Sequence, residues 1–388
     1  MMRKPLLTSV FSLCLLLLSV SAHAQTVRGS IGIFGRLGTW INATTGEGLD
    51  TTYVGIPERP WQLIAQSFTY QSDLLMKSSF DGSQMYQGIV GDVSFQPRIR
   101  TAVTTSAGFW IGYRGWGLGY SNGIWGNNGD DWDFELSSYN YYVKLRLHDF
   151  EGADLETRQS GYLTNSEDPT APPDYFDFTQ PMYLSSPVRI KAQLFEGVYI
   201  FNSSRFSYSA AYDQSLTQLR SAGSALAGLR YFHSDYNYAH DTNADIILNM
   251  NDIGRISTWQ VSVGAGYAYN WVPVKGLLFS IMAMPMVTAY NHINTYRYDS
   301  NYRQLALDDQ YHSDDELSIE DYRISLMDTD SKGSRIMLNV NSRASVAYNW
   351  SRWYLSVNGN FYNARYRYGN SNGRLNDWNV NANIGVRF

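Results

Sequence analysis

The chain has 388 residues, a formal net charge of −5 and an aromatic content of 15%, including 30 tyrosines and 11 tryptophans. The mildly acidic charge argues against a general nucleic-acid binder, which needs a basic surface. The single cysteine, Cys14, lies in the N-terminal apolar run, so the remaining chain excludes disulfides and thiol chemistry.

Residues 1–24 predict a cleaved secretory signal peptide. Arg3 and Lys4 precede the apolar run "LLTSVFSLCLLLLSV", and "AHA" before Gln25 fits a small-x-small cleavage site. A retained anchor is the alternative, but the run is shorter than the roughly 20 residues of a spanning helix. We expect residues 25–60 to form a periplasmic lead-in or a short helix.

Alternation of apolar and polar residues dominates residues 61–388. In "STWQVSVGAGYAYNW", for example, one face carries Val261, Val263, Tyr267, Tyr269 and Trp271. The segments are longer than the ~5–6 residues usual in soluble strands and match the ~9–11 residues that cross a bilayer obliquely. Tyrosine and tryptophan near the segment ends are typical of a lipid–water boundary.

The connections also alternate. "GYRGWG", "FNSSRF", "NWVPVKG" and "NWSRWY" are short, whereas "SNGIWGNNGDD" and residues 296–334 are long and polar. Short periplasmic turns and long outer loops are typical of outer-membrane barrels, so we predict an all-β, closed antiparallel transmembrane β-barrel of about 12 strands. The count has one conflict. Between "FNSSRF" and "NWVPVKG" we identify three strands, near residues 206–212, 224–232 and 261–271, where two periplasmic turns require an even number.

The C-terminal segment "NVNANIGVRF" continues the pattern to the last residue. Val380, Ala382, Ile384, Val386 and Phe388 share one face. An apolar last strand ending in an aromatic predicts an assembly signal, formed by Ile384, Val386 and Phe388, for the machinery that inserts barrels. Recognition by strand addition uses alternate side chains in this way.

A basic ladder is the first candidate site in the lumen. Lys144, Arg146 and His148 lie opposite an apolar stripe, and we expect Arg189, Lys191 and Gln193 to continue the same inner face. A basic wall attracts anionic solutes. The alternative is an ordinary lumen lining in which Asp133, Glu135 or Glu196 pairs with these residues.

The polar segment "DQSLTQLRSAGS" is the second candidate, as a binding or gating site in the lumen. Its alternative is a bulged turn whose polar groups satisfy one another. The residues concerned are Asp213, Gln214, Gln218, Arg220, Ser221 and Ser224.

Two further activities have weaker support. Scattered histidines (His148, His233, His240, His292, His312) allow a Ser–His hydrolase, but no G-x-S-x-G motif occurs. The acidic run "LDDQYHSDDELSIEDY" lacks the spacing of a calcium-binding loop and fits a solvated outer loop better. We therefore assign no catalytic residue, no metal site and no cofactor.

Several stretches together resemble one family. They are "DTTYVGIPERPWQL", "GFWIGYRGWGLGYS", "VYIFNSSRFSYSAAYDQSLTQLRSAGSALAGLRYF" and "VGAGYAYNW". They are similar to an uncharacterised barrel family of Bacteroidetes-type bacteria, known as domain of unknown function 4421, over roughly residues 50–388. The resemblance implies an outer-membrane barrel and implies no activity.

The function expected from these features is a narrow channel or lumenal binding protein for small or anionic solutes. A lipid-modifying hydrolase and a plugged structural or assembly barrel stay open as alternatives. The expected partners are outer-membrane lipid and lipopolysaccharide, the barrel-insertion machinery and a small solute, with no nucleic acid.

Overall fold

The computed structural model describes residues 48–81, 89–126, 129–165, 170, 172–182, 187–237, 253–298, 326–333, 336–368 and 371–388. All of them belong to one compact unit, Gly48–Phe388. The predicted signal peptide lies outside the described residues. Among the described residues, no helix is both long and apolar enough to cross a membrane.

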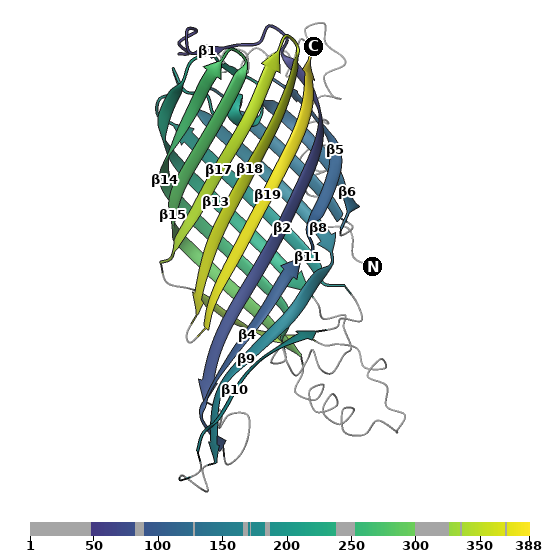
Figure 1. The fold of residues 1–388 in the computed structure, drawn as a ribbon, viewed down its shortest axis with the longest axis vertical. Coiled ribbons are helices and arrows are strands. Elements are labelled where there is room, and N and C mark those ends of the chain that lie inside the picture. Colours follow the sequence, from purple (N-terminus) through teal and green to yellow (C-terminus); the bar gives the residue numbers. More distant parts are fainter. Residues whose placement is uncertain are drawn as a thin grey trace, which may run out of the picture. The chain divides into compact units, whose positions relative to one another are not determined.

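Twelve strands form a closed antiparallel barrel, which confirms the predicted fold class (Figure 1). Each strand pairs with the next around the ring, and the last pairs with the first. In order they are β2 (Trp61–Asp81), β5 (Thr104–Tyr113), β6 (Trp116–Trp125), β7 (Gly129–Ser137), β8 (Tyr141–Glu151), β11 (Arg189–Ile200), β13 (Ala222–Asn237), β14 (Ile253–Val274), β15 (Leu277–Tyr298), β17 (Leu338–Trp350), β18 (Trp353–Tyr368) and β19 (Ser371–Arg387).

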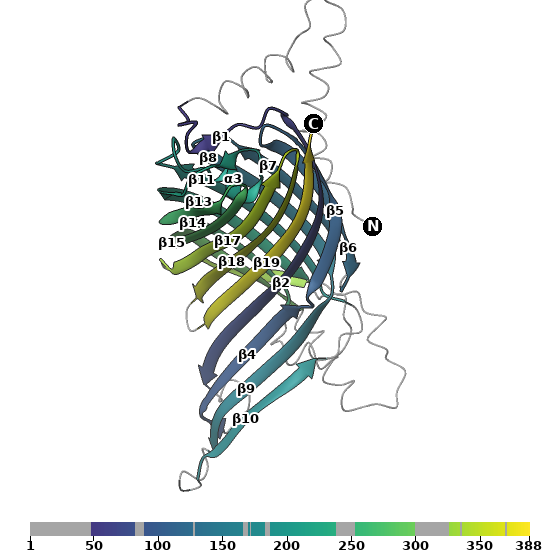
Figure 2. The same ribbon diagram turned by 45° about the horizontal axis from the view of Figure 1, so that its top comes forward.

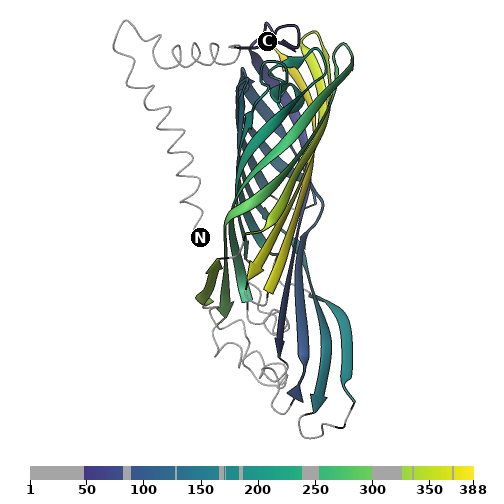
Figure 3. The same cartoon turned by 90° about the vertical axis from the view of Figure 1, so that its left-hand side faces the viewer.

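A smaller sheet projects beyond the ends of β18 and β19 (Figure 3). It consists of the far half of β2 with β4 (Asp92–Thr101), β9 (Ala153–Asn165) and β10 (Asp174–Met182), while β3 (Ile89–Val90) pairs with β9 and β16 (Leu326–Gly333) with β15. The chain passes from β8 into β9 at Gly152, which has a φ of 117°. Glycine adopts this conformation without the steric cost that a side chain imposes.

The opposite end of the barrel has tight turns. Arg114 and Gly115 both have positive φ between β5 and β6, as in the two-residue turns whose twist matches antiparallel strands. We call this the C-terminal end, because Phe388 lies here. Backbone hydrogen bonds join Phe388 to Trp61 in both directions and close the seam of the barrel.

The connection between β11 and β13 folds into this end of the barrel, and we call residues 201–221 the plug segment (Figure 2). It contains α3 (Ser209–Tyr212) and β12 (Thr217–Gln218), and β12 pairs with β1 (Val54–Gly55). The strand predicted near residues 206–212 is therefore wrong. Its apolar residues, Phe206 and Tyr208 among them, are buried within the plug segment. Two strands, β13 and β14, then lie between the turns, which resolves the parity conflict.

Candidate functional site

The lumen wall formed by β7 and β8 is a ladder of ion pairs. Alternation turns Asp131, Asp133 and Glu135 on β7 inward, and the register places them opposite inward-facing His148, Arg146 and Lys144 on β8. The Lys144 ammonium lies 2.6 Å from Glu135, and Arg146 Nε donates to Asp133 over 2.8 Å. His148 Nδ1 pairs with Asp131. The basic ladder is neutralised by its neighbouring strand.

Aromatic rings hold the same ladder in place. The Arg146 guanidinium lies 4.0 Å from the centre of the Phe68 ring. His148 packs against Tyr70 and Phe150 with ring centroids 4.3 Å and 5.2 Å away. These contacts keep the side chains of β8 in one geometry within a filled interior.

A second buried cluster centres on Glu196 of β11. Its carboxylate accepts hydrogen bonds from Arg230 over 3.1 Å and from Arg343 over 2.7 Å. The Arg230 guanidinium also lies 3.7 Å above the Tyr362 ring. From the sequence, Glu196 was predicted only as a possible partner of the basic ladder. The available signal was a lone glutamate in the alternating apolar face Leu194–Glu196–Val198.

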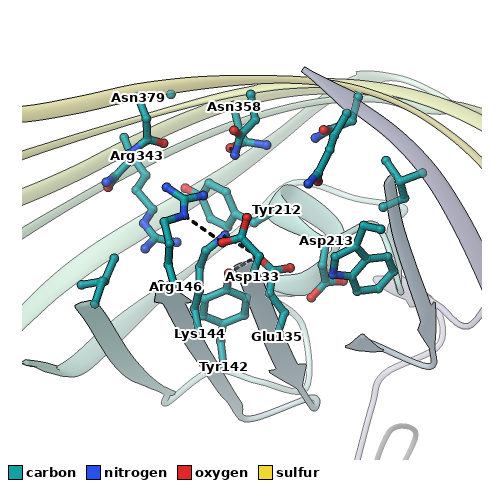
Figure 4. Close-up of a pocket in the computed structure, with 18 residues that line it drawn as sticks. Asp133, Glu135, Tyr142, Lys144, Arg146, Tyr212, Asp213, Arg343, Asn358 and Asn379 are labelled. Atoms are coloured by element: carbon teal, nitrogen blue, oxygen red, sulfur yellow. Dashed lines mark hydrogen bonds and ion pairs between the residues drawn. The ribbon is translucent and has the colours of Figure 1, made fainter. Parts of the chain in front are cut away.

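A small cavity separates the ion-pair wall from a wall of asparagines (Figure 4). The opposing wall includes Asn358, Asn379, Asn381 and Asn383, from β18 and β19. The space open to the centres of water molecules measures about 50 Å³, room for roughly four waters. Pockets for drug-sized ligands typically measure ~300–1,000 Å³, so this cavity is far smaller than such a pocket.

The plug segment forms hydrogen bonds within itself, with the residues before β2 and with the barrel wall. The Gln218 amide nitrogen donates to three backbone carbonyls, those of Tyr53, Arg205 and Arg220. Arg387 Nη2 donates to the carbonyl oxygen of Gln214 over 2.7 Å. The predicted polar segment is thus a hydrogen-bonded closure of the barrel end, as in the alternative interpretation.

Asp213 differs from its neighbours in the plug segment. Its Oδ1 accepts the Ser215 N–H over 2.7 Å, but its Oδ2 is buried without a hydrogen-bond partner. Burial raises the pKa of Asp213 to about 7; the Ser215 hydrogen bond opposes this and repulsion from Glu135 adds to it. Asp213 also lines the cavity (Figure 4), so a carboxyl group with a raised pKa borders this space.

The remaining candidates of the predicted polar segment are two serines that accept backbone hydrogen bonds and one exposed arginine. Ser221 Oγ accepts the Val272 N–H, and Ser224 Oγ accepts the Asn202 N–H. Arg220 is exposed at the barrel end, with its guanidinium 5.8 Å from the Tyr53 ring.

Arg189 and Lys191 do not lie in the lumen, and this part of the basic ladder was predicted wrongly. The register of β11 turns Ile190, Leu194 and Val198 inward, where they are buried. Arg189 and Lys191 therefore face outward and pair with Asp149 at 3.0 Å and 3.9 Å. The apolar stripe of β11 faces inward, where Ile190, Leu194 and Val198 pack within the buried hydrophobic cluster.

The described histidines are placed in aromatic stacks. His233 stacks on Trp259, and His292 stacks on Tyr290, on the outward face of β13–β15. The described residues contain no cluster of three metal-ligating side chains. His240, His312 and the whole acidic run lie outside the described part of the chain.

The fold was also compared with solved structures. The outer-membrane protease OmpT of Escherichia coli is similar at 8% identity and a TM-score of 0.41, covering 86% of this chain and 97% of that chain. The translocator domain of the autotransporter NalP of Neisseria meningitidis has 9% identity and a TM-score of 0.30, covering 95% and 98%. Such distant likenesses carry no information on activity.

A search of curated protein sequences finds no match. A family model described as a domain of unknown function, DUF4421, matches residues 49–388. The matched range contains the barrel, the plug segment and the projecting sheet. The chain belongs to the DUF4421 family.

Proposed function

We propose that this protein is an outer-membrane β-barrel with a closed lumen, which acts as a rigid scaffold for the sheet that projects beyond it. The observation that carries the proposal is the filled interior. Among the described residues, paired charges, the Glu196 cluster and the plug segment occupy the interior around small cavities, one of about 50 Å³ and two of about 20 Å³ each.

The outer surface supports the membrane location. Large apolar side chains face outward and are exposed, including Phe109 (67%), Ile281 (65%) and Leu338 (59%). In water such a belt is unfavourable, whereas in lipid it is the expected surface of a closed barrel. A closed ring of strands also pairs the backbone groups that lipid cannot satisfy.

Aromatic residues border this belt at two levels. Trp271 stands near the C-terminal end of the barrel, and Trp259 stands twelve residues away on β14, beside His233 and His292. Twelve residues at ~3.3 Å each, tilted by ~40°, span roughly 30 Å. This spacing matches the hydrocarbon thickness of a bilayer.

A gated channel for small polar solutes is the second candidate. It is favoured by the cavity itself, which lies between the ion-pair wall and the asparagine wall and has Asp213 at its border. Lys144 and Arg146 of the ion-pair wall each lie against a carboxylate, so this wall offers an anion no unpaired ammonium or guanidinium group. A lipid hydrolase has no support from the described histidines, because each one is held in an ion pair or an aromatic stack.

Ion conductance in planar bilayers tests the proposal. We expect no stable current steps from the refolded wild type, and steps from a variant in which Gly-Ser residues replace the plug segment between Phe206 and Leu216. A mobility difference between unboiled and boiled samples establishes folding in each case. If that variant does not fold, Lys144→Ala/Arg146→Ala is used instead. It removes two side chains from the lumen and leaves the plug segment unchanged. Stable wild-type currents contradict the closed scaffold and favour the channel.

A further inference from the structure

Four basic residues gather on the outward face where the barrel wall ends. Arg365 and Arg367 lie on β18, Arg374 on β19 and Lys77 on β2, and all four are exposed. The residues that alternate with them, such as Tyr366 and Leu375, point inward and are buried. We call these four residues the basic rim cluster.

The strand register brings the members of the cluster together. Arg365 lies directly opposite Arg374 on the neighbouring strand. One step further out, Asn372 pairs with Arg367 on one side and with Lys77 on the other. Directly opposed side chains on adjacent strands have Cβ atoms ~4.5–5.5 Å apart. The cluster therefore forms one continuous patch over β18, β19 and β2.

The cluster differs in its ion pairing from three other arginines on the outer surface. Three other outward-facing arginines are paired: Arg189 with Asp149, Arg255 with Asp235, and Arg98 with Asp73. None of the four cluster residues forms an ion pair within the described part of the chain. Like charges placed directly opposite each other on adjacent strands destabilise a sheet. An anion bound between Arg365 and Arg374 replaces this repulsion with attraction between the anion and each guanidinium group.

The position of the cluster indicates which anion is available. Phe361 on β18 and Val380 on β19 are the last large apolar side chains of the exposed belt on this face. Arg365 follows Phe361 by four residues, and it follows Trp353, at the other border of the belt, by twelve. Twelve tilted residues span roughly 30 Å, which places the guanidinium groups beside the phosphates of the far leaflet.

We propose that the basic rim cluster binds the phosphate groups of a lipid in the outer leaflet of the membrane. The inference rests on the proposed membrane location. Arginine suits this role because its planar guanidinium binds phosphate oxygens in a bidentate manner. A lipid with two phosphates matches a patch three strands wide better than one with a single headgroup phosphate.

The test measures lipid binding to the full chain refolded in a neutral detergent, by native mass spectrometry. The probe is bisphosphorylated lipid A, with its dephosphorylated form as the reference lipid. We expect the wild type to retain only the phosphorylated form. The variant Arg365→Gln/Arg367→Gln/Arg374→Gln is expected to bind at least about tenfold more weakly, since three charge-assisted contacts are lost.

Two control variants separate charge from folding. Arg189→Gln changes a paired outward arginine on another part of the wall and should keep wild-type binding. Arg365→Lys/Arg367→Lys/Arg374→Lys keeps the charge and should bind more strongly than the glutamine variant. The boiled and unboiled mobilities show independently that each variant forms a barrel, so failure of the fold and failure of this inference are distinguishable.

Three results overturn the inference. The first is equal retention of phosphorylated and dephosphorylated lipid by the wild type. The second is unchanged binding by the folded glutamine variant. The third is displacement of the lipid by millimolar inorganic phosphate, which assigns the cluster to free phosphate instead of a membrane lipid.

Discussion

Arginines pair with carboxylates both in the barrel interior and in the projecting sheet. The pair in the interior is buried, whereas the pair in the projecting sheet is exposed to water. Glu196 and Arg230 have side chains that are 2% and 1% exposed. Arg158 and Asp177, which join β9 to β10, are 52% and 53% exposed, although their 2.6 Å separation is shorter. Desolvation makes an interior pair indispensable once formed, because either partner alone is a buried charge. In water the same contact contributes little.

The largest expected effect comes from removing the charge of Glu196. Glu196→Gln leaves Arg230 and Arg343 buried without a counterion, and loss of one partner of a buried pair typically costs about 3–5 kcal/mol. We expect the urea midpoint, followed by tryptophan fluorescence in detergent, to fall accordingly. An unchanged midpoint would show that water screens the interior, and the contrast with the projecting sheet would disappear.

Asp213 tests the cost of a buried charge that has no ion pair. It is a buried carboxyl and forms no salt bridge among the described residues. Its pKa is raised by burial to about 7, so the folded state favours the protonated form. The free energy of unfolding should therefore decrease as the pH rises from about 4 through about 7. Asp213→Asn should remove this decrease and be the more stable protein at pH 8, by at most about 4 kcal/mol. Parallel pH profiles of the two proteins would contradict this.

Deletion of Phe388 at the seam of the barrel tests whether assembly in cells and stability of the folded barrel depend on different features. Phe388 is exposed and contacts Trp61 through backbone hydrogen bonds. Its ring contributes about 1.5–3 kcal/mol at most by area, which is too little to open a closed barrel. We expect deletion of Phe388 to lower outer-membrane levels in cells while refolding into detergent stays normal. Equal outer-membrane levels of the wild type and the deletion variant would show that Phe388 acts only as part of the apolar belt.

The smallest effect is expected in the projecting sheet. Arg158→Gln breaks the exposed pair with Asp177 and should change the free energy of unfolding by less than about 1 kcal/mol. The same urea titration used for Glu196→Gln measures it. A loss comparable to that of Glu196→Gln would mean that the projecting sheet is covered, and that both regions obey the same electrostatics.

The sequence alone determined the fold class and most strand faces. The alternation in β14, β17 and β19 requires one apolar and one polar face, and lipid selects the apolar face as the outer surface. Lys144 and Arg146 could be placed inward for the same reason. The aromatic residues beside the short turns also marked one border of the belt, because amphipathic rings favour the boundary between lipid and water.

Only the tertiary structure decided what fills the lumen. On β11 both faces of the alternation are partly apolar, so the pattern could not say that Ile190 faces inward and Arg189 outward; the register with β8 decided it. Residues 206–212 of the plug segment were mistaken for a strand because burial inside a barrel selects the same residues as burial within a sheet. In the Glu196 cluster, Arg230 lies directly opposite Glu196 on the neighbouring strand β13. Arg343 is 147 positions away on β17, which is not a neighbour of β11, and it meets Glu196 only when the barrel closes.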